Sequence, residues 1–492
     1  MVRSRLGECP TAASLLLKPS PAFPGAIVMP SQPSFRPRPR RTISTLEQIC
    51  PDAAGIDCGA AAHWVAVPPD RDAMPVRSFR TFTTDLQALA DWLIACRVTT
   101  VAMEATGVYW IPLFEILEAR GLTVLLVNAR HVKHVAGRKS DVADCEWLRD
   151  LLMVGLLRGS FRPAQAIVPL RAYLRHRATL LESASMYVHR MQKALVQMNV
   201  QLTLVVSDIT GLTGLRILRD IVAGQRDPHQ LAAHRDRRCH ASAADIVAAL
   251  TGNYRPEHVF LLQQNLELFD AVHHQLRACD AAIAAELALL TAPCPPPATP
   301  LPEDQRRRAP RANEPRFDMR TPLHRLTGLD LSQIDGIGPY TALRLVAEIG
   351  TDMRRWPTAQ HFTSWLTLAP QNRLSGGRRL SSRTQPSANR AAAILRLAAM
   401  SLGRTDTALG AFYRRLAFRV GKAKAITATA RKLALLVYRS LADGLLYQDP
   451  GAAAYEAQHR AHVLRRLRRQ ATQLGISLVD MATGEVLEEV VS

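Results

Sequence analysis

The sequence predicts an α/β sheet domain, then a long helical region, then a mainly α-helical C-terminal domain. Three observations lead to this order. Strand patterns come first and then alternate with helical patterns between residues 53 and 157. A sevenfold apolar repeat occupies residues 170–206. After about residue 323 the chain is basic, rich in Ala and helical in its spacing.

The N-terminal part divides into a leader and the α/β domain. Residues 1–46 are rich in Pro, Ser and Arg and lack an apolar period, which predicts a disordered basic leader. The α/β domain is expected over residues 47–160, and its first two strands form a hairpin. The predicted strands are 53–67, 75–82, 99–103 and 122–127, and the predicted helices are 85–96, 111–119 and 140–157.

The helical region, residues 161–292, carries the clearest periodicity. Apolar residues recur seven apart and again three positions further on, and Arg177 interrupts one position of this seam. The two series are Leu174, Leu181, Val188, Leu195 and Leu202, and Ala184, Met191, Met198 and Val205. The pattern is typical of a coiled coil, within one chain or between chains. An ordinary amphipathic helix packed inside the monomer is the alternative.

Three segments complete the chain. Residues 293–322 are rich in Pro and Arg, which predicts a linker. Residues 323–474 are expected to form the C-terminal domain. Residues 475–492 are the tail, with a small hairpin predicted around Ala482-Thr483-Gly484.

Charge and cysteine content narrow the class of protein. The chain has 62 Lys and Arg against 42 Asp and Glu, a net charge of +20, which indicates a polyanionic partner such as nucleic acid. The eight cysteines are scattered without a C-x-x-C pair, so neither a disulfide framework nor a structural zinc site is expected. No apolar run approaches the roughly 20 residues of a membrane span. We therefore expect a cytoplasmic protein with no membrane partner.

Four carboxylates in the α/β domain are candidates for metal chemistry. Asp57 lies within the first strand, Glu104 ends a buried strand, and Asp141 and Asp144 share one face at the start of a helix. A carboxylate at the end of an apolar strand is costly unless it is paired or metal-bound. Four such oxygen donors suit two Mg²⁺ or Mn²⁺ ions. Taken singly, Asp141 could be a helix N-terminal acid and Asp57 could end a strand in a turn.

Basic and glycine-rich stretches mark the second half. Ser375 stands beside two glycines in a stretch containing Arg373, Arg378, Arg379 and Arg383. The residues alone favour a flexible basic loop over a nucleophile there. Gly336 and Gly338 predict either a helix-hairpin-helix turn that holds a DNA phosphate or a tight interhelical turn. Lys422 and Lys424 lie in a basic helical stretch suited to phosphate contact.

Several of these stretches resemble one family of transposases. Gly55-Ile56-Asp57, Ala102 to Gly107 and Lys139 to Asp144 are similar to the DEDD domain of the insertion-sequence "one-ten" family. Segments 334–350 and 365–377, with Asn389-Arg390 leading a helix, resemble that family's C-terminal transposase domain. Gln385-Pro386 departs from the pattern, since basic residues are expected before the Asn.

The resemblance implies a fold and a set of roles. The N-terminal domain would be RNase H-like, similar to the junction resolvase RuvC. Asp57, Glu104, Asp141 and Asp144 would be catalytic metal ligands. Ser375 would be the nucleophile. The nucleic-acid-binding residues would be Gly336, Gly338, the four arginines around Ser375, Asn389, Arg390, Lys422 and Lys424.

The predicted function is DNA strand transfer by a transposase of a bacterial mobile element. The partners implied are element-end and target DNA, a structured guide RNA and further copies of the chain in a dimer or tetramer. The protein would associate with the nucleoid when bound to DNA. Two alternatives remain: a metal-dependent junction resolvase or nuclease without a serine adduct, and a catalytically silent nucleic-acid-binding protein.

Overall fold

The computed structural model describes residues 47–128, 140–303, 313–479 and 484. The leader predicted over residues 1–46, Lys139, and Ala482 and Thr483 of the predicted tail hairpin lie outside these residues. The chain divides into two compact units, and the division falls between Phe161 and Arg162. Each unit is described separately.

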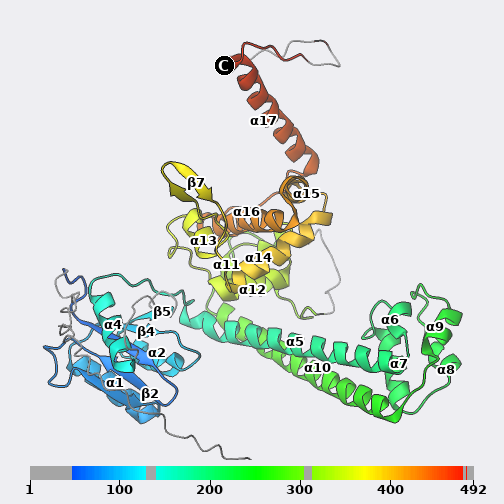
Figure 1. Cartoon of the computed structure of the whole chain (residues 1–492), viewed down its shortest axis with the longest axis horizontal. Helices are drawn as coiled ribbons and strands as arrows, with labels where there is room; N and C mark the ends of the chain where they lie inside the picture. Colours follow the sequence, from blue (N-terminus) through cyan, green and yellow to red (C-terminus); the bar gives the residue numbers. More distant parts are fainter. Residues whose placement is uncertain (1–46, 129–139, 304–312, 480–483, 485–492) are drawn as a thin grey trace, which may run out of the picture. The chain divides into compact units, whose positions relative to one another are not determined.

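A five-stranded mixed sheet forms the centre of the N-terminal unit (Figure 1). Its strands are β1 (Ala53–Cys58), β2 (Ala62–Ala66), β3 (Val76–Arg80), β4 (Thr100–Glu104) and β5 (Thr123–Val127), in the order β3-β2-β1-β4-β5. β1, β2 and β3 pair antiparallel, whereas β1, β4 and β5 pair parallel. The predicted mixed α/β sheet is confirmed, and its arrangement is consistent with an RNase H-like domain.

Helices cover both faces of this sheet because side chains along each strand alternate between the faces. Ala54, Ile56 and Cys58 of β1 join one buried cluster with α1 (Thr83–Ala95) and α2 (Trp110–Ala119). Ala53 belongs to a second cluster with Leu148 and Leu152 of α4 (Asp141–Met153). The residues of β1 with odd numbers therefore face α4.

Two long helices, α5 (Val168–Gln197) and α10 (Pro256–Thr291), lie side by side in the second unit (Figure 1). The 3-10 turn η2 (Gln165–Ile167) precedes α5. Four short helices lie between the long ones: α6 (Leu202–Val205), α7 (Leu212–Val222), α8 (Pro228–Ala232) and α9 (Ala243–Leu250). We call these four the tip helices, and they share a buried cluster with the adjoining ends of α5 and α10.

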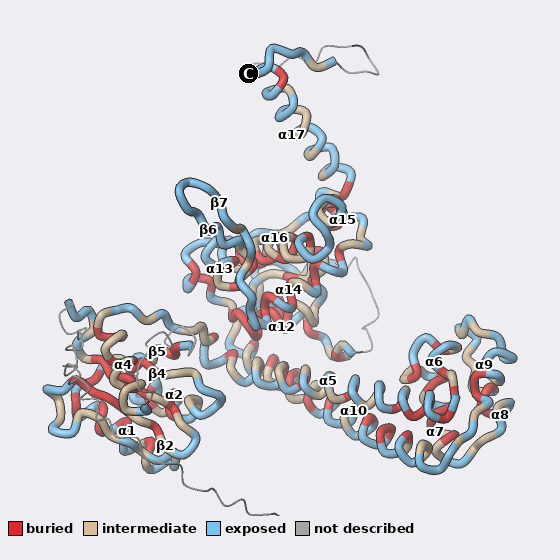
Figure 2. The backbone as a smooth tube through the Cα atoms, in the orientation of Figure 1, coloured by how far each residue is buried: buried red, intermediate tan, exposed pale blue. Residues whose placement is uncertain are grey.

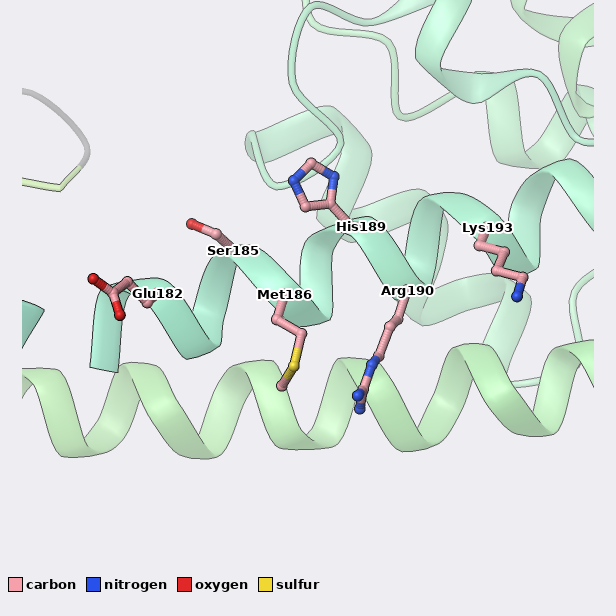
Figure 3. A pocket seen from close by; sticks show the side chains of 6 residues that line it. All are labelled: Glu182, Ser185, Met186, His189, Arg190 and Lys193. Carbon is pink, nitrogen blue, oxygen red and sulfur yellow. The ribbon is translucent and has the colours of Figure 1, made fainter. Parts of the chain in front are cut away.

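The sevenfold repeat lies mostly on α5 and packs inside the chain. Met191 and Leu195 are buried with Leu262 and Phe269 of α10. Leu181, by contrast, is only half-buried. The predicted long helix is confirmed, while coiled-coil geometry is not shown. The opposite face of α5 is polar and lines an open groove with Glu182, Ser185, Met186, His189, Arg190 and Lys193 (Figure 3).

Arg177, which interrupts the repeat, ties three parts of this unit together. Its side chain is 3% exposed and pairs with Asp280 of α10 at 2.6 Å. The guanidinium also donates to the Asn313 carbonyl and to the Tyr340 hydroxyl, both at 2.9 Å. A buried arginine requires such partners. The break in the apolar pattern is thus an anchoring point.

The C-terminal body consists mainly of helices. Those before the small hairpin are α11 (Arg320–Thr327), η3 (Leu331–Gln333), α12 (Pro339–Ile349) and α13 (Ala359–Trp365). The hairpin is β6 (Arg373–Ser375) and β7 (Arg378–Ser381). Then follow α14 (Arg390–Ser401), η4 (Leu402–Arg404), α15 (Ala408–Val420), α16 (Lys422–Asp443) and α17 (Ala452–Gln473). Figure 2 shows buried backbone along α12, α14 and α16 and an exposed hairpin.

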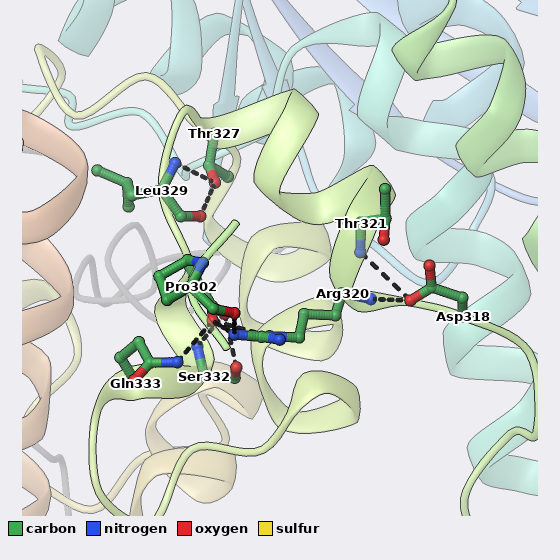
Figure 4. Close-up of polar contacts among 9 residues, drawn as sticks. Pro302, Asp318, Arg320, Thr321, Thr327, Leu329, Ser332 and Gln333 are labelled. Atoms are coloured by element: carbon green, nitrogen blue, oxygen red, sulfur yellow. Dashed lines mark hydrogen bonds and ion pairs between the residues drawn. The ribbon is translucent and has the colours of Figure 1, made fainter. Parts of the chain in front are cut away.

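The described parts of the predicted linker, 293–303 and 313–319, contain no helix or strand, and α11 begins within its range. They are nevertheless held to α11 by hydrogen bonds (Figure 4). Arg325 donates to the Cys294 carbonyl at 2.9 Å, and Arg320 donates to the Pro302 carbonyl at 2.6 Å. Arg320 also pairs with the buried carboxylate of Asp330 at 2.6 Å. In the described parts of the chain, no helix combines the length and apolarity needed to cross a membrane.

Candidate active site

Asp57 and Glu104 occupy neighbouring positions on one face of the sheet. β1 and β4 run parallel with Ile56 beside Met103, so the next residues along each strand are Asp57 and Glu104. Ala102 shares the buried cluster with α4, and alternation places Glu104 on that same face. Asp57 is on the α4 face for the same reason. The strand pairing thus juxtaposes two of the four predicted acids.

The other two acids begin the helix that covers this face. Ser140 caps α4 by accepting a hydrogen bond from the Ala143 backbone N–H at 3.2 Å. Asp141 and Asp144 follow in the first turn, where the helix dipole favours carboxylates. Asp141 is exposed and Asp144 is half-buried. Only glycine at position 55 allows α4 to lie this close to β1, since a Cβ there would meet the Cys145 carbonyl oxygen at 2.2 Å.

Burial and nearby negative charges affect the pKa values of two thiols in this region. Burial, together with the charges of Asp57 and Glu104, holds the pKa of Cys58 well above its ordinary value. Burial and the charges of Glu146 and Asp57 raise the pKa of Cys145 to about 12. The Glu104 carboxylate also accepts a hydrogen bond from the Thr106 hydroxyl at 3.0 Å. Nearby carboxylates thus add to the effect of burial at both thiols.

The four acids do not form a completed cluster. Among the described residues, which omit the stretch 129–139 directly before α4, no three His, Cys, Asp or Glu side chains lie close enough to hold a metal ion. The donor set is nevertheless one of hard oxygen ligands, which fits Mg²⁺ or Mn²⁺.

Ser375 is the last residue of β6 and not part of an irregular loop. It pairs with Arg378 across a two-residue turn formed by Gly376 and Gly377, whose φ angles are +53° and +74°. Two consecutive positive φ angles define the turn that matches the twist of a hairpin, and glycine adopts them without strain. Ser375 and the surrounding Arg373, Arg378, Arg379 and Arg383 are all exposed. The hairpin thus presents a hydroxyl and several guanidinium groups to solvent.

The remaining predicted contact residues have mixed surroundings. Gly336 has a φ of +82°, and a Cβ there would lie 3.0 Å from the Ala398 carbonyl, so this glycine serves close packing. Gly338 precedes the first turn of α12 in open space. Asn389 caps α14 by accepting from the Ala392 N–H at 3.1 Å, which gives it a structural role. Arg390 is the first residue of α14 and is exposed.

Lys422 and Lys424 are exposed in the first turn of α16, which Gly421 precedes with a φ of +87°. Cations at a helix N-terminus oppose the helix dipole. An anion bound there would offset this repulsion.

Two groups of charged residues were not predicted from the sequence. Glu348 of α12 is buried and pairs with Arg171 and Arg175 of α5 at 3.1 and 2.7 Å. A second group of cations lies between α15 and α17. The repeated arginines of α17 are visible in the sequence. Their neighbours on α15 lie about 40 positions away, so the sequence does not show that these side chains come together.

Two family models match the chain. The first, a transposase model of the DEDD type, covers residues 54–200 and hence nearly all of the sheet, its acids and the whole of α5. The second, described as "Transposase IS116/IS110/IS902 family", covers residues 330–414, including the Ser375 hairpin. The curated proteins contain no match. The fold, the acids and both models define the protein as a transposase, an enzyme of DNA transposition.

Both matches also agree on the family, and they occur in order along the chain. Together they support an IS110-family transposase. The DEDD type of the first domain implies the use of divalent metal ions in general, and a transposase binds DNA.

Proposed function

We propose that this transposase cuts and rejoins DNA strands with two sets of groups, the acids of the sheet domain and Ser375 of the hairpin. The observation that carries the proposal is the placement of Asp57 and Glu104 at adjacent strand positions beneath the helix that bears Asp141 and Asp144. These four would hold two Mg²⁺ or Mn²⁺ ions. Bound divalent ions supply Lewis-acid stabilisation of charge on a phosphodiester.

Ser375 is the proposed nucleophile. Its oxygen forms a bond to phosphorus, and the bond from phosphorus to one sugar oxygen breaks. The serine proton passes to water, and the released sugar oxygen takes up a proton from water. Attack by a new sugar hydroxyl on the phosphoserine reverses these steps and joins the strands. The exposed arginines beside Ser375 hold the phosphate by paired hydrogen bonds.

Nucleic-acid contacts elsewhere complete the proposal. Gly338, Arg390, Lys422 and Lys424 are exposed or border open space, which supports backbone contacts. The net charge of +20 supports binding of both DNA and a structured guide RNA. A homo-oligomer is supported by Leu261 and Leu268 of α10, which are seven residues apart and 45% and 44% exposed.

One set of variants tests the chemistry. Asp57→Asn should abolish strand cleavage and retain DNA binding, because a ligand is lost while the basic surface is unchanged. Ser375→Ala should abolish the covalent protein–DNA species. The matched controls are Asp91→Asn, an exposed acid on α1, and Ser382→Ala, an exposed serine just after β7. Labelled element-end DNA incubated with Mg²⁺ and run on a denaturing protein gel gives both readouts.

The outcomes separate the three functions. An adduct that requires Ser375 supports strand transfer through phosphoserine. Metal-dependent nicking that survives Ser375→Ala without an adduct identifies a nuclease or resolvase. Binding without cleavage under all metal conditions identifies a silent nucleic-acid-binding protein. Cleavage retained by Asp57→Asn would reject the metal assignment.

A further inference from the structure

A cationic pocket of about 300 Å³ lies between α15 and α17, outside the groups already assigned to the chemistry. Both helices belong to the second unit. Four of its seven lining residues carry a guanidinium or imidazole group, and one carries a carboxylate. The lining consists of Ala411, Arg414, Arg415, Tyr455, Glu456, His459 and Arg460.

Arg415 lines this pocket, and one of its donor atoms has no partner among the described residues. Its Nη2 donates to the Tyr455 hydroxyl, and its guanidinium lies 5.1 Å from the centre of the Tyr455 ring. Its Nη1 is buried and has no hydrogen-bond partner among the described residues. Buried donors are nearly always paired, and Arg415 also lines the pocket, so an anion bound there could supply an acceptor to its guanidinium.

Neighbouring cations increase the positive field. The Lys432 ammonium of α16 lies 4.3 Å from the Phe412 ring centre, and desolvation together with Arg415 lowers its pKa. Desolvation, followed by the charges of Arg415, His462 and Arg419, lowers the pKa of His459. Cations that disfavour one another's charged forms are relieved by a bound anion.

The charge continues along α17 beyond the pocket. Arg465, Arg466 and Arg469 are exposed, and Glu456 is the helix's single acidic residue. Arg460 and Arg469 are nine residues apart, a rise of about 13 Å along a helix. That distance is longer than a single phosphate group. It fits a polyanion whose charges repeat at regular intervals.

We propose that the α15–α17 pocket binds a backbone phosphate of a nucleic acid, with Arg415 as the buried donor and Arg414 and Arg460 on the rim. The arginines of α17 then contact successive phosphates of the same strand. Such contacts position the nucleic acid and read no sequence. The inference rests on the proposed function in that nucleic acid is the partner, and it assigns a second contact region remote in sequence from Ser375.

The test uses the full chain with Arg414→Gln plus Arg460→Gln. Both side chains are exposed, so the fold should tolerate the change, and a thermal melt equal to the wild type's checks this. The control, Arg219→Gln plus Arg238→Gln, also removes two exposed positive charges, each paired with an aspartate as Arg414 is with Asp406, but outside the pocket. The probes are a labelled mixed-sequence DNA duplex and a single-stranded RNA of equal length. Binding is titrated by fluorescence anisotropy over a range of KCl concentrations.

The pocket variant should bind more weakly, and its slope of log affinity against log salt should fall by about 0.9 per lost duplex contact, or about 0.7 on a single strand. If affinity falls for one probe alone, the pocket binds that nucleic acid. If affinity falls for both probes, the pocket binds the backbone phosphate of either DNA or RNA. Glu456→Gln removes the lining carboxylate and should tighten binding.

Affinities and slopes equal to those of the control on both probes, with no gain from Glu456→Gln, would overturn the inference. A wild-type protein that binds neither probe would instead reject the proposed function. The two failures are therefore distinguishable.

Discussion

Gly55 is the residue at which the sheet and α4 come closest. An added Cβ would lie 2.2 Å from the Cys145 carbonyl oxygen and 2.4 Å from the Arg149 backbone nitrogen. Both are backbone atoms of a helix, which cannot turn aside as a side-chain tip can. The position of α4, and with it that of Asp141 and Asp144, therefore depends on the absence of one methyl group.

Gly55→Ala should destabilise the N-terminal unit by about 3 kcal/mol, the upper range for overpacking, because α4 must move away from β1. Gly338→Ala is the control, since its backbone is extended and a Cβ there meets nothing within 4 Å. Urea unfolding followed by circular dichroism measures the effect. A variant as stable as the control would show that α4 accommodates the methyl group.

Single residues differ in how far the sequence could predict them. The adjacency of Asp57 and Glu104 follows from strand pairing, which the apolar runs around each acid already implied. The residues around Ser375 favour a loop, although Ser375-Gly-Gly-Arg378 also fits a two-residue hairpin. In the sequence Arg177 is only a break in the repeat, because its partners, Asp280 and Tyr340, are more than 100 positions away.

Among the elements, α5 and α12 are joined by a buried carboxylate. Glu348 accepts hydrogen bonds from Arg175 at 2.9 and 2.7 Å and pairs with Arg171. Burial alone would raise the pKa of Glu348, but the hydrogen bond from Arg175 and the charges of Arg171, Arg175 and Arg390 outweigh it and lower the pKa. The ionised carboxylate thus stabilises the contact between the long helices and the C-terminal body.

Glu348→Gln should reduce the free energy of unfolding at pH 7 by about 2 kcal/mol, less than for a fully buried pair because Arg175 is partly exposed. Since the folded pKa lies below the unfolded one, the stabilisation is present above pH of about 4.3 and is lost as pH falls through the folded pKa. Wild type and variant should therefore converge on acidification. Glu182→Gln, an exposed α5 acid, is the control. A gap that persists unchanged at acidic pH would contradict this account.

The partner of an element is less predictable than the element itself. The sevenfold repeat indicated a long helix with an apolar stripe, and α5 is that helix. It could not indicate that the stripe packs on Leu262 and Phe269, because a periodic stripe specifies a surface and not the segment that covers it. The basic, Ala-rich spacing likewise predicted helices after residue 323 without predicting that α15 and α17 enclose a pocket.

At the scale of the whole molecule, self-association is expected through α10. Replacing the exposed Leu261 and Leu268 with Lys should lower the mass measured by light scattering, because charge replaces two apolar contacts of one stripe. Ser185→Lys plus Gln197→Lys adds the same charge at exposed positions of α5 and should leave the mass unchanged. A mass unaffected by either pair would exclude the α10 stripe as the interface.

The side-by-side arrangement of α5 and α10 sets the tip helices at a distance from the ion pairs near the start of α5. A helix of 30 residues, the length of α5, extends about 45 Å. The tip helices lie at one end, and the ion pairs of Arg175 and Arg177 lie near the other. A rotation of about 5° about these ion pairs would move the far end of α5 by roughly 3 Å, given the helix rise. Small rearrangements of these two arginine ion pairs would thus displace the tip helices by several ångströms.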